Sequence, residues 1–469
     1  MPLGPVISLT RRRRYPAGVS ETHTDTPTVV EHPRVSVIGT GYLGATHAVA
    51  MVELGFEVIG VDVDERKIEM LRNGQVPFYE PGLPELLAKV QATGRLHWST
   101  DIADAAAFAD VHYICVGTPQ KPDELAADLT YVDAAFTELA KHLDRRCLVV
   151  GKSTVPVGTA ARLSAMLAET APAGAEVELA WNPEFLREGF AVEDTLRPDR
   201  LVFGVRSAWA EAQMRAAYAP VLATGTPLVV CDYPTAEMVK VAANSFLATK
   251  ISFINAMAEV CEVTGADVTQ LADAIGYDER IGRKFLNAGL GFGGGCLPKD
   301  IRAFMARVGE LGVDQAVSFL RDIDAINQRR RVRTVEIGID LLHGTFRGSK
   351  VAVLGAAFKP DSDDIRDSPA LDVATLVKRL GGDVKLYDPK AMDNARAKFP
   401  ELGYADSLAD AVADADLVML LTEWQEFRAM DPETIGAVVK RRNVVDGRNV
   451  LDPAQWRAAG WTYAALGRP

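Results

Sequence analysis

The chain has 469 residues, of which 48% are hydrophobic and 24% are charged, and its formal net charge is −12. A chain of this length forms more than one hydrophobic core, so we expect two to four domains. The acidic balance argues against nucleic acid and anionic membrane surfaces as partners, because both attract cationic proteins. An anionic ligand must therefore be held by locally placed cations.

The cysteines and the N-terminal tail indicate a cytoplasmic protein. The five cysteines are far apart and form no CxxC pair or metal-ligand spacing, which favours a reducing compartment and predicts no metal site. No apolar run approaches the roughly 18 residues that a membrane span needs. Residues 1–33 include Arg11 to Arg14 but no apolar segment of the kind that a secretion signal contains. We expect this tail to be disordered.

The first ordered segment carries a dinucleotide-binding pattern. A predicted strand at Val35–Ile38 runs into a GxGxxG turn and a helix, and a second strand ends on Asp62, 18 residues after the last glycine. Such a turn points a helix N-terminus at a diphosphate, and the acid binds the ribose hydroxyls. A carboxylate there repels a 2′-phosphate, so NAD is favoured over NADP; the alternative is a glycine-rich turn without a nucleotide. The predicted contacts in the turn are Gly39, Gly41, Tyr42, Leu43 and Gly44.

Further strand-like runs alternate with helical stretches up to residue 205, which predicts a doubly wound parallel sheet. Polar residues follow the carboxyl ends of these runs, where ligands bind in open α/β sheets. A turn or a helix cap is the alternative role for each of them. The candidates are Thr118, Ser153, Thr154, Glu184 and Glu188.

A long helix is predicted from Ala236 to Thr264, with Thr235 as its N-cap and Gly265 as its end. About 28 residues at 1.5 Å each span roughly 42 Å, more than one domain needs, so we expect a spine between two domains that also forms a dimer surface. Lys240 and Asn244 are four residues apart and share a face, where they could stabilise an oxyanion. The alternative is a pair of solvated surface residues.

The stretch from Gly289 to Asp300 contains five glycines in seven positions just before Cys296. Glycines leave the sulfur unshielded, Lys299 is a cation that favours thiolate, and Asp300 could orient a water molecule. A glycine-rich surface loop that happens to contain a cysteine is the alternative. Because residues 267–335 join the two halves of the chain, Cys296 is expected in the cleft between them.

The last third repeats the first in outline, with strands predicted at 351–355, 384–388, 415–421 and 444–446. Its first turn lacks GxGxxG, so an anion there would depend on Lys359, Arg366 and Arg448. The predicted fold is α/β, with two Rossmann-like doubly wound parallel-sheet domains joined by a long central helix. The predicted boundaries are 1–33 for the tail, 34–230 for the NAD-binding domain, 231–335 for the helical segment with the cysteine loop, and 336–469 for the second Rossmann-like domain.

A thiol beside a nicotinamide is useful when an aldehyde must be oxidised further. The thiolate adds to the aldehyde, the thiohemiacetal loses hydride to give a thioester, and water opens the thioester. A simple alcohol dehydrogenase has no use for this thiol.

From about residue 34 to about residue 455 the chain resembles the UDP-glucose 6-dehydrogenase family, which are four-electron sugar-nucleotide dehydrogenases. The resemblance rests on several separate motifs that occur in order. They are the glycine turn, Pro77–Leu83, Val116–Pro119, Ser153–Thr159, Asn182–Gly189, Lys240–Asn244, Gly291–Asp300 and Phe358–Pro360.

The resemblance implies roles for individual residues. Cys296 would be the nucleophile, Lys240 and Asn244 would steady the oxyanion, and Glu184, Thr118 and Asp300 would handle protons and water, with one water shared by Thr118 and Asp300. The implied NAD contacts outside the glycine turn are Asp62, Lys67, Thr118, Thr154, Glu188 and Arg366. The implied substrate contacts are Glu184, Phe185, Leu186, Lys240, Asn244, Asn287, Gly291, Phe292, Gly293, Phe358, Lys359 and Arg448, together with Arg280 from a neighbouring subunit of a homodimer or larger homo-oligomer.

The implied reaction is oxidation of UDP-glucose to UDP-glucuronate with two NAD. The UDP-glucose branch of the family is resembled by Asp278–Gly282, Lys284–Leu286 and Gly291–Gly293, which favours UDP-glucose over GDP-mannose or a UDP-N-acetylhexosamine as the substrate. A β-hydroxyacid dehydrogenase also pairs GxGxxG with a Lys-x-x-x-Asn helix but does not need Cys296. A non-catalytic sugar-nucleotide-binding protein would not be expected to keep Cys296, Lys240 and Asp300 together.

Overall fold

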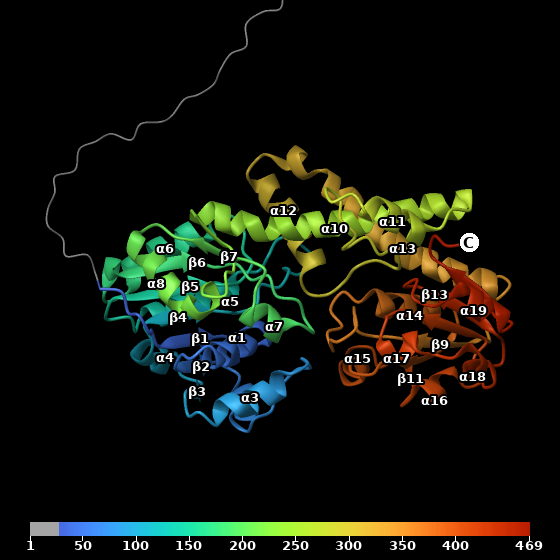
Figure 1. Ribbon diagram of the computed structural model, residues 1–469, viewed down its shortest axis with the longest axis horizontal. Coiled ribbons are helices and arrows are strands. Elements are labelled where there is room, and N and C mark those ends of the chain that lie inside the picture. Colours follow the sequence, from blue (N-terminus) through green and yellow to red (C-terminus); the bar gives the residue numbers. More distant parts are fainter. Residues whose placement is uncertain (1–27) are drawn as a thin grey trace, which may run out of the picture.

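The structure is a computed structural model that describes residues 28–469. It contains an eight-stranded sheet in the order β3-β2-β1-β4-β5-β6-β7-β8 and a six-stranded sheet in the order β11-β10-β9-β12-β13-β14. The first sheet and its helices (residues 28–231) form the front lobe, and the second sheet and its helices (residues 350–469) form the rear lobe. Helical residues 232–349 connect the two lobes (Figure 1).

The front sheet is parallel from β1 to β6, as predicted, but β7 pairs antiparallel with β6 and parallel with β8. The last two strands therefore run against the others. The strands are β1 (Val35–Ile38), β2 (Val58–Val61), β3 (Leu96–Ser99), β4 (Val111–Ile114), β5 (Cys147–Gly151), β6 (Val177–Trp181), β7 (Leu201–Gly204) and β8 (Leu228–Cys231).

Helices cover both faces of this sheet because its strands are apolar on both sides. Along β5, Leu148 and Val150 belong to one core, whereas Cys147 and Val149 belong to the other. The helical elements are α1 (Tyr42–Glu53), α2 (Glu65–Arg72), α3 (Leu83–Gln91), α4 (Ile102–Phe108), α5 (Thr130–Ala140), α6 (Thr159–Thr170), η1 (Gly174–Glu176), α7 (Ala191–Leu196), α8 (Ala208–Ala217) and α9 (Ala219–Leu222).

Residues 1–33 were predicted to be disordered, but the last residues of this tail make defined contacts with the front lobe. Trp209 Nε1 donates a hydrogen bond to the Thr28 carbonyl, and Val30 exchanges two hydrogen bonds with the side chain of Gln213. Residues 28–30 therefore pack on α8 of the front lobe. The rest of that prediction, residues 1–27, lies outside the described residues.

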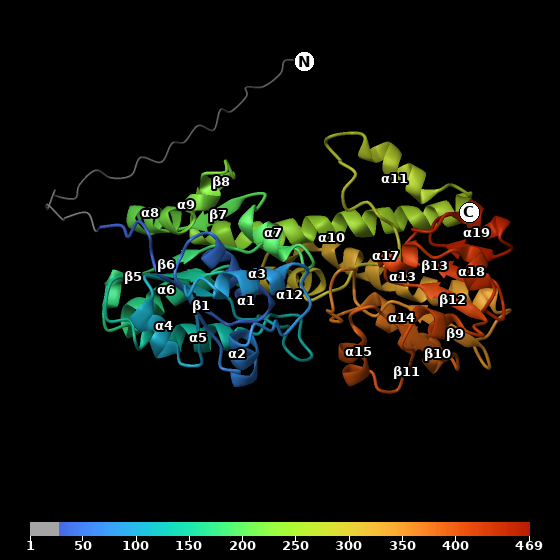
Figure 2. The same cartoon turned by 60° about the horizontal axis from the view of Figure 1, so that its bottom comes forward.

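Helix α10 (Tyr233–Thr264) is 32 residues long and lies along both lobes in both views (Figures 1 and 2). It begins three residues before the predicted start because the Asp232 carboxylate, rather than Thr235, caps it by accepting from the Thr235 amide at 2.9 Å. It ends at Gly265, as predicted, with φ +78°. The remaining elements of this segment are α11 (Val268–Gly276), α12 (Leu297–Glu310), η2 (Asp314–Val317) and α13 (Phe319–Leu341).

The rear sheet is parallel throughout and repeats the order of the first six front strands, which confirms the predicted repeat. Its strands are β9 (Lys350–Leu354), β10 (Asp383–Tyr387), β11 (Gly403–Tyr404), β12 (Leu417–Leu420), β13 (Asn443–Asp446) and β14 (Thr462–Ala465). Its helices are α14 (Pro369–Arg379), α15 (Met392–Lys398), α16 (Leu408–Val412), α17 (Gln425–Arg428), α18 (Pro432–Gly436) and α19 (Pro453–Ala458).

The predicted boundary between residues 335 and 336 falls inside α13, which continues to Leu341. We therefore propose that the rear lobe begins after this helix. Between residues 28 and 469, none of the helices combines the length and the apolar character that crossing a membrane requires.

Candidate active site

The glycine turn after β1 leaves the N-terminus of α1 open. A Cβ at Gly44 would lie 1.8 Å from the Gly39 carbonyl oxygen, and Gly39 itself has φ +89°, so both positions require glycine. Gly41 precedes α1, no side chain caps the helix there, and a Cβ on Gly41 would meet nothing within 4 Å. The free amides of this turn therefore face a space that a diphosphate can occupy.

Asp62 lies beside this turn, at the end of β2. Its Oδ2 accepts from the Thr40 amide at 2.8 Å and from the Thr40 hydroxyl at 3.2 Å, and the Lys67 amine is 3.9 Å away. The carboxylate and the amine are placed as an adenosine ribose requires, so the residues present fit NAD. Leu43 packs on the hydrophobic core, so its backbone is the part of it that is available to a cofactor.

In the rear lobe, the acid at the position that corresponds to Asp62 has different contacts. Asp388, at the end of β10, is 1% exposed and accepts from the amides of Ala356 and Ala357 and from the indole of Trp424. A buried and saturated carboxylate cannot bind a ribose hydroxyl. The rear lobe therefore keeps the fold of a nucleotide-binding half but not the adenosine contact of the front lobe.

Cys296 lies immediately before α12, at the end of the glycine loop (residues 289–295). It is exposed, whereas Cys115, Cys147 and Cys261 are buried and Cys231 is half-buried. Because the lobes around the sulfur displace much of the surrounding water, desolvation raises the pKa of the Cys296 thiol, and Asp300 raises it further. The positive charges of Lys240 and Lys299 oppose this rise without cancelling it.

The predicted cation beside the thiol is therefore present, but it does not make Cys296 a resting thiolate. A thiol with a raised pKa must lose its proton as it attacks. The site accordingly needs a base near Cys296 during the reaction.

A chain of polar contacts joins four segments of the chain near Cys296. Asp300 is 2% exposed and accepts from the Asn244 amide and from the Lys299 amine, both at 2.6 Å. The same amine lies 3.4 Å from the Thr118 hydroxyl, which donates to the Thr154 carbonyl at 2.9 Å. The Lys299 amine thus stands between Thr118 and Asp300, where we expected a shared water molecule.

Glu184 follows β6, and hydrogen-bond donors contact both of its carboxylate oxygens. Its Oε1 accepts from the amides of Phe185 and Leu186 at 2.7 and 2.9 Å, and its Oε2 lies 3.0 Å from the amine of Lys152. Burial alone would raise the pKa of Glu184, but the charge and hydrogen bond of Lys152, the Leu186 amide and the charge of Lys240 together outweigh burial, so the pKa lies below its usual value. Our sequence analysis did not single out Lys152, although it directly follows β5 at the ligand edge of the sheet.

Helix α10 contacts the Asp300 carboxylate and acts on the Glu184 carboxylate through charge. Asn244 binds Asp300, and the amine of Lys240 lies 5.5 Å from the centre of the Phe185 ring and lowers the pKa of Glu184. Both α10 side chains are buried, at 9% and 6% exposure for Lys240 and Asn244. The shared face predicted for these two residues therefore points into the site rather than to solvent.

Glu188 bridges the two lobes. Its carboxylate accepts from the Ser362 hydroxyl at 2.9 Å and lies 3.3 Å from the Arg366 guanidinium, and its carbonyl accepts from Lys359. Burial, together with the negative charge of Asp364, raises the pKa of Glu188 to about 7. Arg366 also lies against the glycine loop, since a Cβ on Gly295 would be 2.3 Å from its Cζ atom.

Arg448 fastens the glycine loop to the rear lobe. Its guanidinium donates to the carbonyls of Gly291 at 3.0 Å, Phe358 at 3.2 Å and Leu421 at 2.8 Å. A Cβ on Gly293 would lie 2.1 Å from the Asp367 carbonyl oxygen, so the loop and the rear lobe touch through their backbones. The predicted substrate residues Gly291, Gly293, Phe358, Lys359 and Arg448 thus meet at one junction.

Three predicted substrate residues are placed elsewhere. The Phe292 side chain is 6% exposed and packs against α10 and α12, and its amide and carbonyl both bond the Asn327 side chain. Phe292 therefore anchors the loop instead of facing a ligand. Asn287 is exposed and accepts from Arg283, and Arg280, whose side chain is 89% exposed, pairs with Asp278 on the surface of its own chain.

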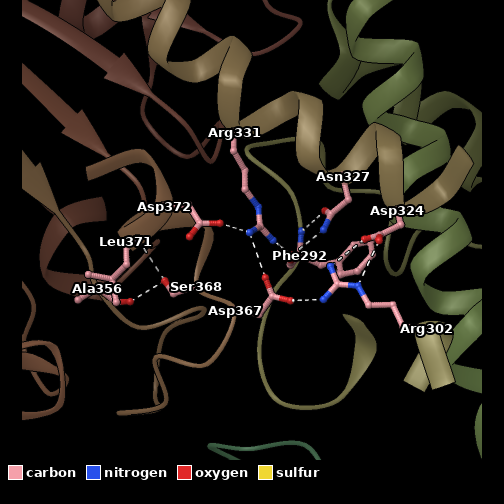
Figure 3. A network of polar contacts seen from close by, with 10 residues as sticks. All are labelled: Phe292, Arg302, Asp324, Asn327, Arg331, Ala356, Asp367, Ser368, Leu371 and Asp372. Carbon is pink, nitrogen blue, oxygen red and sulfur yellow. Dashed lines mark hydrogen bonds and ion pairs between the residues drawn. The ribbon is translucent and has the colours of Figure 1, made fainter. Parts of the chain in front are cut away.

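The glycine loop is held in place by a network of ion pairs (Figure 3). Arg331 of α13 contacts Asp367 at 3.0 Å and donates to the Phe292 carbonyl at 3.1 Å, and it also pairs with Asp372. Arg302 of α12 contacts the other oxygen of Asp367 at 3.1 Å. One rear-lobe aspartate, which has φ +48°, therefore joins α12, α13 and the loop.

We predict that Arg331→Ala lowers the free energy of unfolding by about 1 to 3 kcal/mol, because it empties the space of a buried side chain and removes the hydrogen bonds to Asp367 and to the Phe292 carbonyl. Chemical denaturation would measure this loss, and hydrogen exchange in residues 289–295 should become faster. Arg329→Ala is the matched control, since Arg329 is on the same helix but 55% exposed in its pair with Glu259. Equal stability of the two variants would contradict the anchoring role of Arg331.

Comparison with known proteins gives consistent matches along the chain. Three models of the UDP-glucose/GDP-mannose dehydrogenase family match it: the NAD binding domain at residues 33–222, the central domain at 234–329 and the UDP binding domain at 352–453. The UDP-glucose 6-dehydrogenase of Rhizobium meliloti strain 1021 is 43% identical over 438 residues, which are 93% of this chain and 100% of that protein.

Two solved structures are similar over almost their full length. The UDP-glucose dehydrogenase of Pyrobaculum islandicum has 36% identity and a TM-score of 0.86, and the match covers 96% of this chain and 100% of that one. A UDP-D-ManNAc dehydrogenase of Pyrococcus horikoshii has 26% identity and a TM-score of 0.81, with 93% and 99% coverage.

Proposed function

The chain belongs to the UDP-glucose/GDP-mannose dehydrogenase family and is an NAD-dependent enzyme, and from this premise we propose that it oxidises UDP-glucose to UDP-glucuronate. Oxidation beyond the aldehyde to the acid is supported by one observation, the exposed Cys296 between the lobes. The choice of UDP-glucose is supported by the 43% identity to the Rhizobium meliloti enzyme of that name.

The first oxidation converts the C6 hydroxyl of the sugar to an aldehyde. Lys240 and Asn244 stabilise the negative charge that develops on the oxygen, and Glu184 accepts the hydroxyl proton. NAD, held by the glycine turn and Asp62, supplies the hydride acceptor for this oxidation and for the next one. Lys359 and Arg448 offer the positive charge for the diphosphate of the sugar nucleotide.

The second oxidation passes through Cys296. The sulfur bonds to the aldehyde carbon, and a base in the cleft carries the thiol proton to the carbonyl oxygen, which becomes the hydroxyl of a thiohemiacetal. Loss of a hydride and the hydroxyl proton gives a thioester. A water molecule oriented by Asp300 then attacks the carbonyl carbon, the carbon–sulfur bond breaks, and the acid and the free thiol are released.

The experiment is an assay of the purified protein with NAD and each of UDP-glucose, GDP-mannose and UDP-N-acetylhexosamines. We expect two NADH for each UDP-glucose consumed, with UDP-glucuronate as the product. NADH formed with GDP-mannose or a UDP-N-acetylhexosamine alone would replace the proposed substrate by that sugar nucleotide. Binding without NADH formation would indicate a sugar-nucleotide-binding protein.

We further propose that two copies pack through α10. Phe246, Phe253 and Val260 are seven residues apart and 66%, 48% and 52% exposed, so they form one apolar stripe on the helix. A second copy that covers this stripe would remove it from water. Arg280 extends from the loop after α11 and is then free to reach the site of the partner.

The dimer predicts that two inactive variants restore each other. Cys296→Ser and Arg280→Ala should each be nearly inactive, but a mixed dimer contains one site with both wild-type residues. Random exchange of subunits should recover about a quarter of wild-type activity. Absence of any recovery would show that Arg280 does not act across subunits.

Phe253→Glu should give monomers by light scattering, whereas Val438→Glu, on the exposed surface of the rear lobe, should not.

A further inference from the structure

The amine of Lys152 is fully paired inside the front lobe. Lys152 is 4% exposed, and its Nζ lies 2.9 Å from Asn182 Oδ1, 3.2 Å from the Tyr218 hydroxyl and 3.0 Å from Glu184 Oε2. An ammonium group has three protons, and here three acceptors receive them. The amine is thus held at one point, directly behind the carboxylate.

The partners of Lys152 are fixed in turn. The Tyr218 hydroxyl donates to Asn182 Oδ1 at 2.6 Å, and the Asn182 amide donates to the Val202 carbonyl at 3.0 Å. Tyr218 and Asn182 are buried, at 3% and 1% exposure. A charge in this position cannot turn away to solvent, so its only ionic partner at this point is Glu184.

We propose that Lys152 is a positioning residue that keeps Glu184 ionised and aimed at the substrate, so that Glu184 begins the cycle as a proton acceptor. Both oxygens of Glu184 are engaged by donors, two backbone amides and the Lys152 amine. A carboxylate surrounded by donors is an anion and cannot serve as the initial acid. This inference rests on the proposed function and assigns one direction of proton transfer within it.

Other charged and titratable groups face this pair from several elements. Lys240 of α10 acts on Glu184 in the same direction as Lys152. His47 of α1, Tyr113 of β4 and Cys115 surround Lys152, but all three are buried and neutral. The pKa of His47 is lowered by burial and by the charge of Lys152, so it does not titrate against Glu184 near neutral pH. Removing the charge of Lys152 should therefore change the pKa of Glu184.

The test is the pH dependence of kcat/KM for Lys152→Met. Without the cation the pKa of Glu184 rises, so a larger fraction of it is protonated at a given pH, and the acidic limb of the profile should move upward by about one pH unit or more. Activity at neutral pH should also fall about 10-fold, because the Glu184 carboxylate loses a partner that holds its orientation rather than because it becomes protonated there. A fall of similar size with an unmoved acidic limb would overturn the proposal and leave Lys152 a structural residue.

A double variant separates the charge effect from a packing effect. In a Glu184→Gln background there is no carboxylate to ionise, so adding Lys152→Met should change kcat/KM by less than about threefold. If the loss of kcat/KM in the double variant equals the product of the losses in the two single variants, Lys152 acts independently of Glu184. If Lys152→Met does not fold, Lys152→Gln keeps a hydrogen-bond donor without the charge and should show the same displaced limb.

Failure of this inference and failure of the proposed function are distinguishable. If the wild-type protein forms NADH with another sugar nucleotide, the pH profiles are measured with that substrate, and the inference stands or falls on them. If the wild type oxidises UDP-glucose and the acidic limb of Lys152→Met stays in place, only the role given to Lys152 is wrong.

Discussion

Cys296→Ser is expected to lower formation of UDP-glucuronate at least 1,000-fold, roughly the loss found when a nucleophile is removed. A serine hydroxyl in the same place is a much weaker nucleophile at neutral pH, and the charges around Cys296 do not favour its ionisation. The first oxidation does not need the sulfur, so a single turnover of NADH and an aldehyde should still be detectable. Product analysis and NADH absorbance measure the two steps separately.

Cofactor binding provides the internal check, because the glycine turn and Asp62 lie on the front lobe and do not depend on Cys296. The affinity for NAD should be unchanged within about twofold. Cys231→Ser, at a half-buried position at the end of β8, is the matched control and should keep full activity. Undiminished acid production by Cys296→Ser would exclude the thioester route.

Asp300→Asn is expected to slow turnover about 100- to 1,000-fold, with the larger effect on hydrolysis. The substitution keeps the shape of the side chain but removes the negative charge that the Lys299 amine and the Asn244 amide approach at 2.6 Å. It also places an amide group beside the Asn244 amide, where the Asp300 carboxylate accepted a hydrogen bond. With the water no longer oriented, the thioester should accumulate on Cys296.

Intact-mass spectrometry of the quenched enzyme measures this accumulation directly. The covalent adduct should be visible in Asp300→Asn and absent in the double variant with Cys296→Ser. Glu310→Gln is the matched control, since Glu310 is on the same helix but 56% exposed. If Asp300→Asn turns over more slowly without any adduct, Asp300 acts before the thioester forms.

Local patterns predicted the front of the site well. Gly39, Gly44 and Asp62 belong to one βαβ unit, so their spacing along the chain is enough to place them together. The alternation of elements likewise predicted two doubly wound sheets, but it did not predict the order of their strands or the reversed direction of β7 and β8. The start of α10 was missed by three residues because the choice between Asp232 and Thr235 as the cap depends on side-chain geometry.

Contacts between distant segments could not be predicted in this way. Lys152 reaches Asn182 and Tyr218, which are 30 and 66 positions away, and no pattern within a single segment reports such a pairing. The same is true of the Lys299 amine beside Thr118, 181 positions away. Phe292 was misplaced because an apolar residue in a motif can equally line a ligand or fill a core, and only the packing of α10 and α12 decides which.

The attachment of the glycine loop to the rear lobe has a consequence for the exchange of the cofactor during the reaction. An enzyme that uses one NAD site twice must release the reduced molecule and admit a fresh one while the half-oxidised sugar remains in place. Gly294 bonds the Arg366 carbonyl at 2.9 Å and Arg448 bonds the Gly291 carbonyl, so the loop that carries the sulfur is fixed to the lobe that holds the sugar nucleotide. The glycine turn that receives NAD belongs to the other lobe, so in the proposed reaction it can be emptied and refilled without separating the sulfur from the aldehyde carbon.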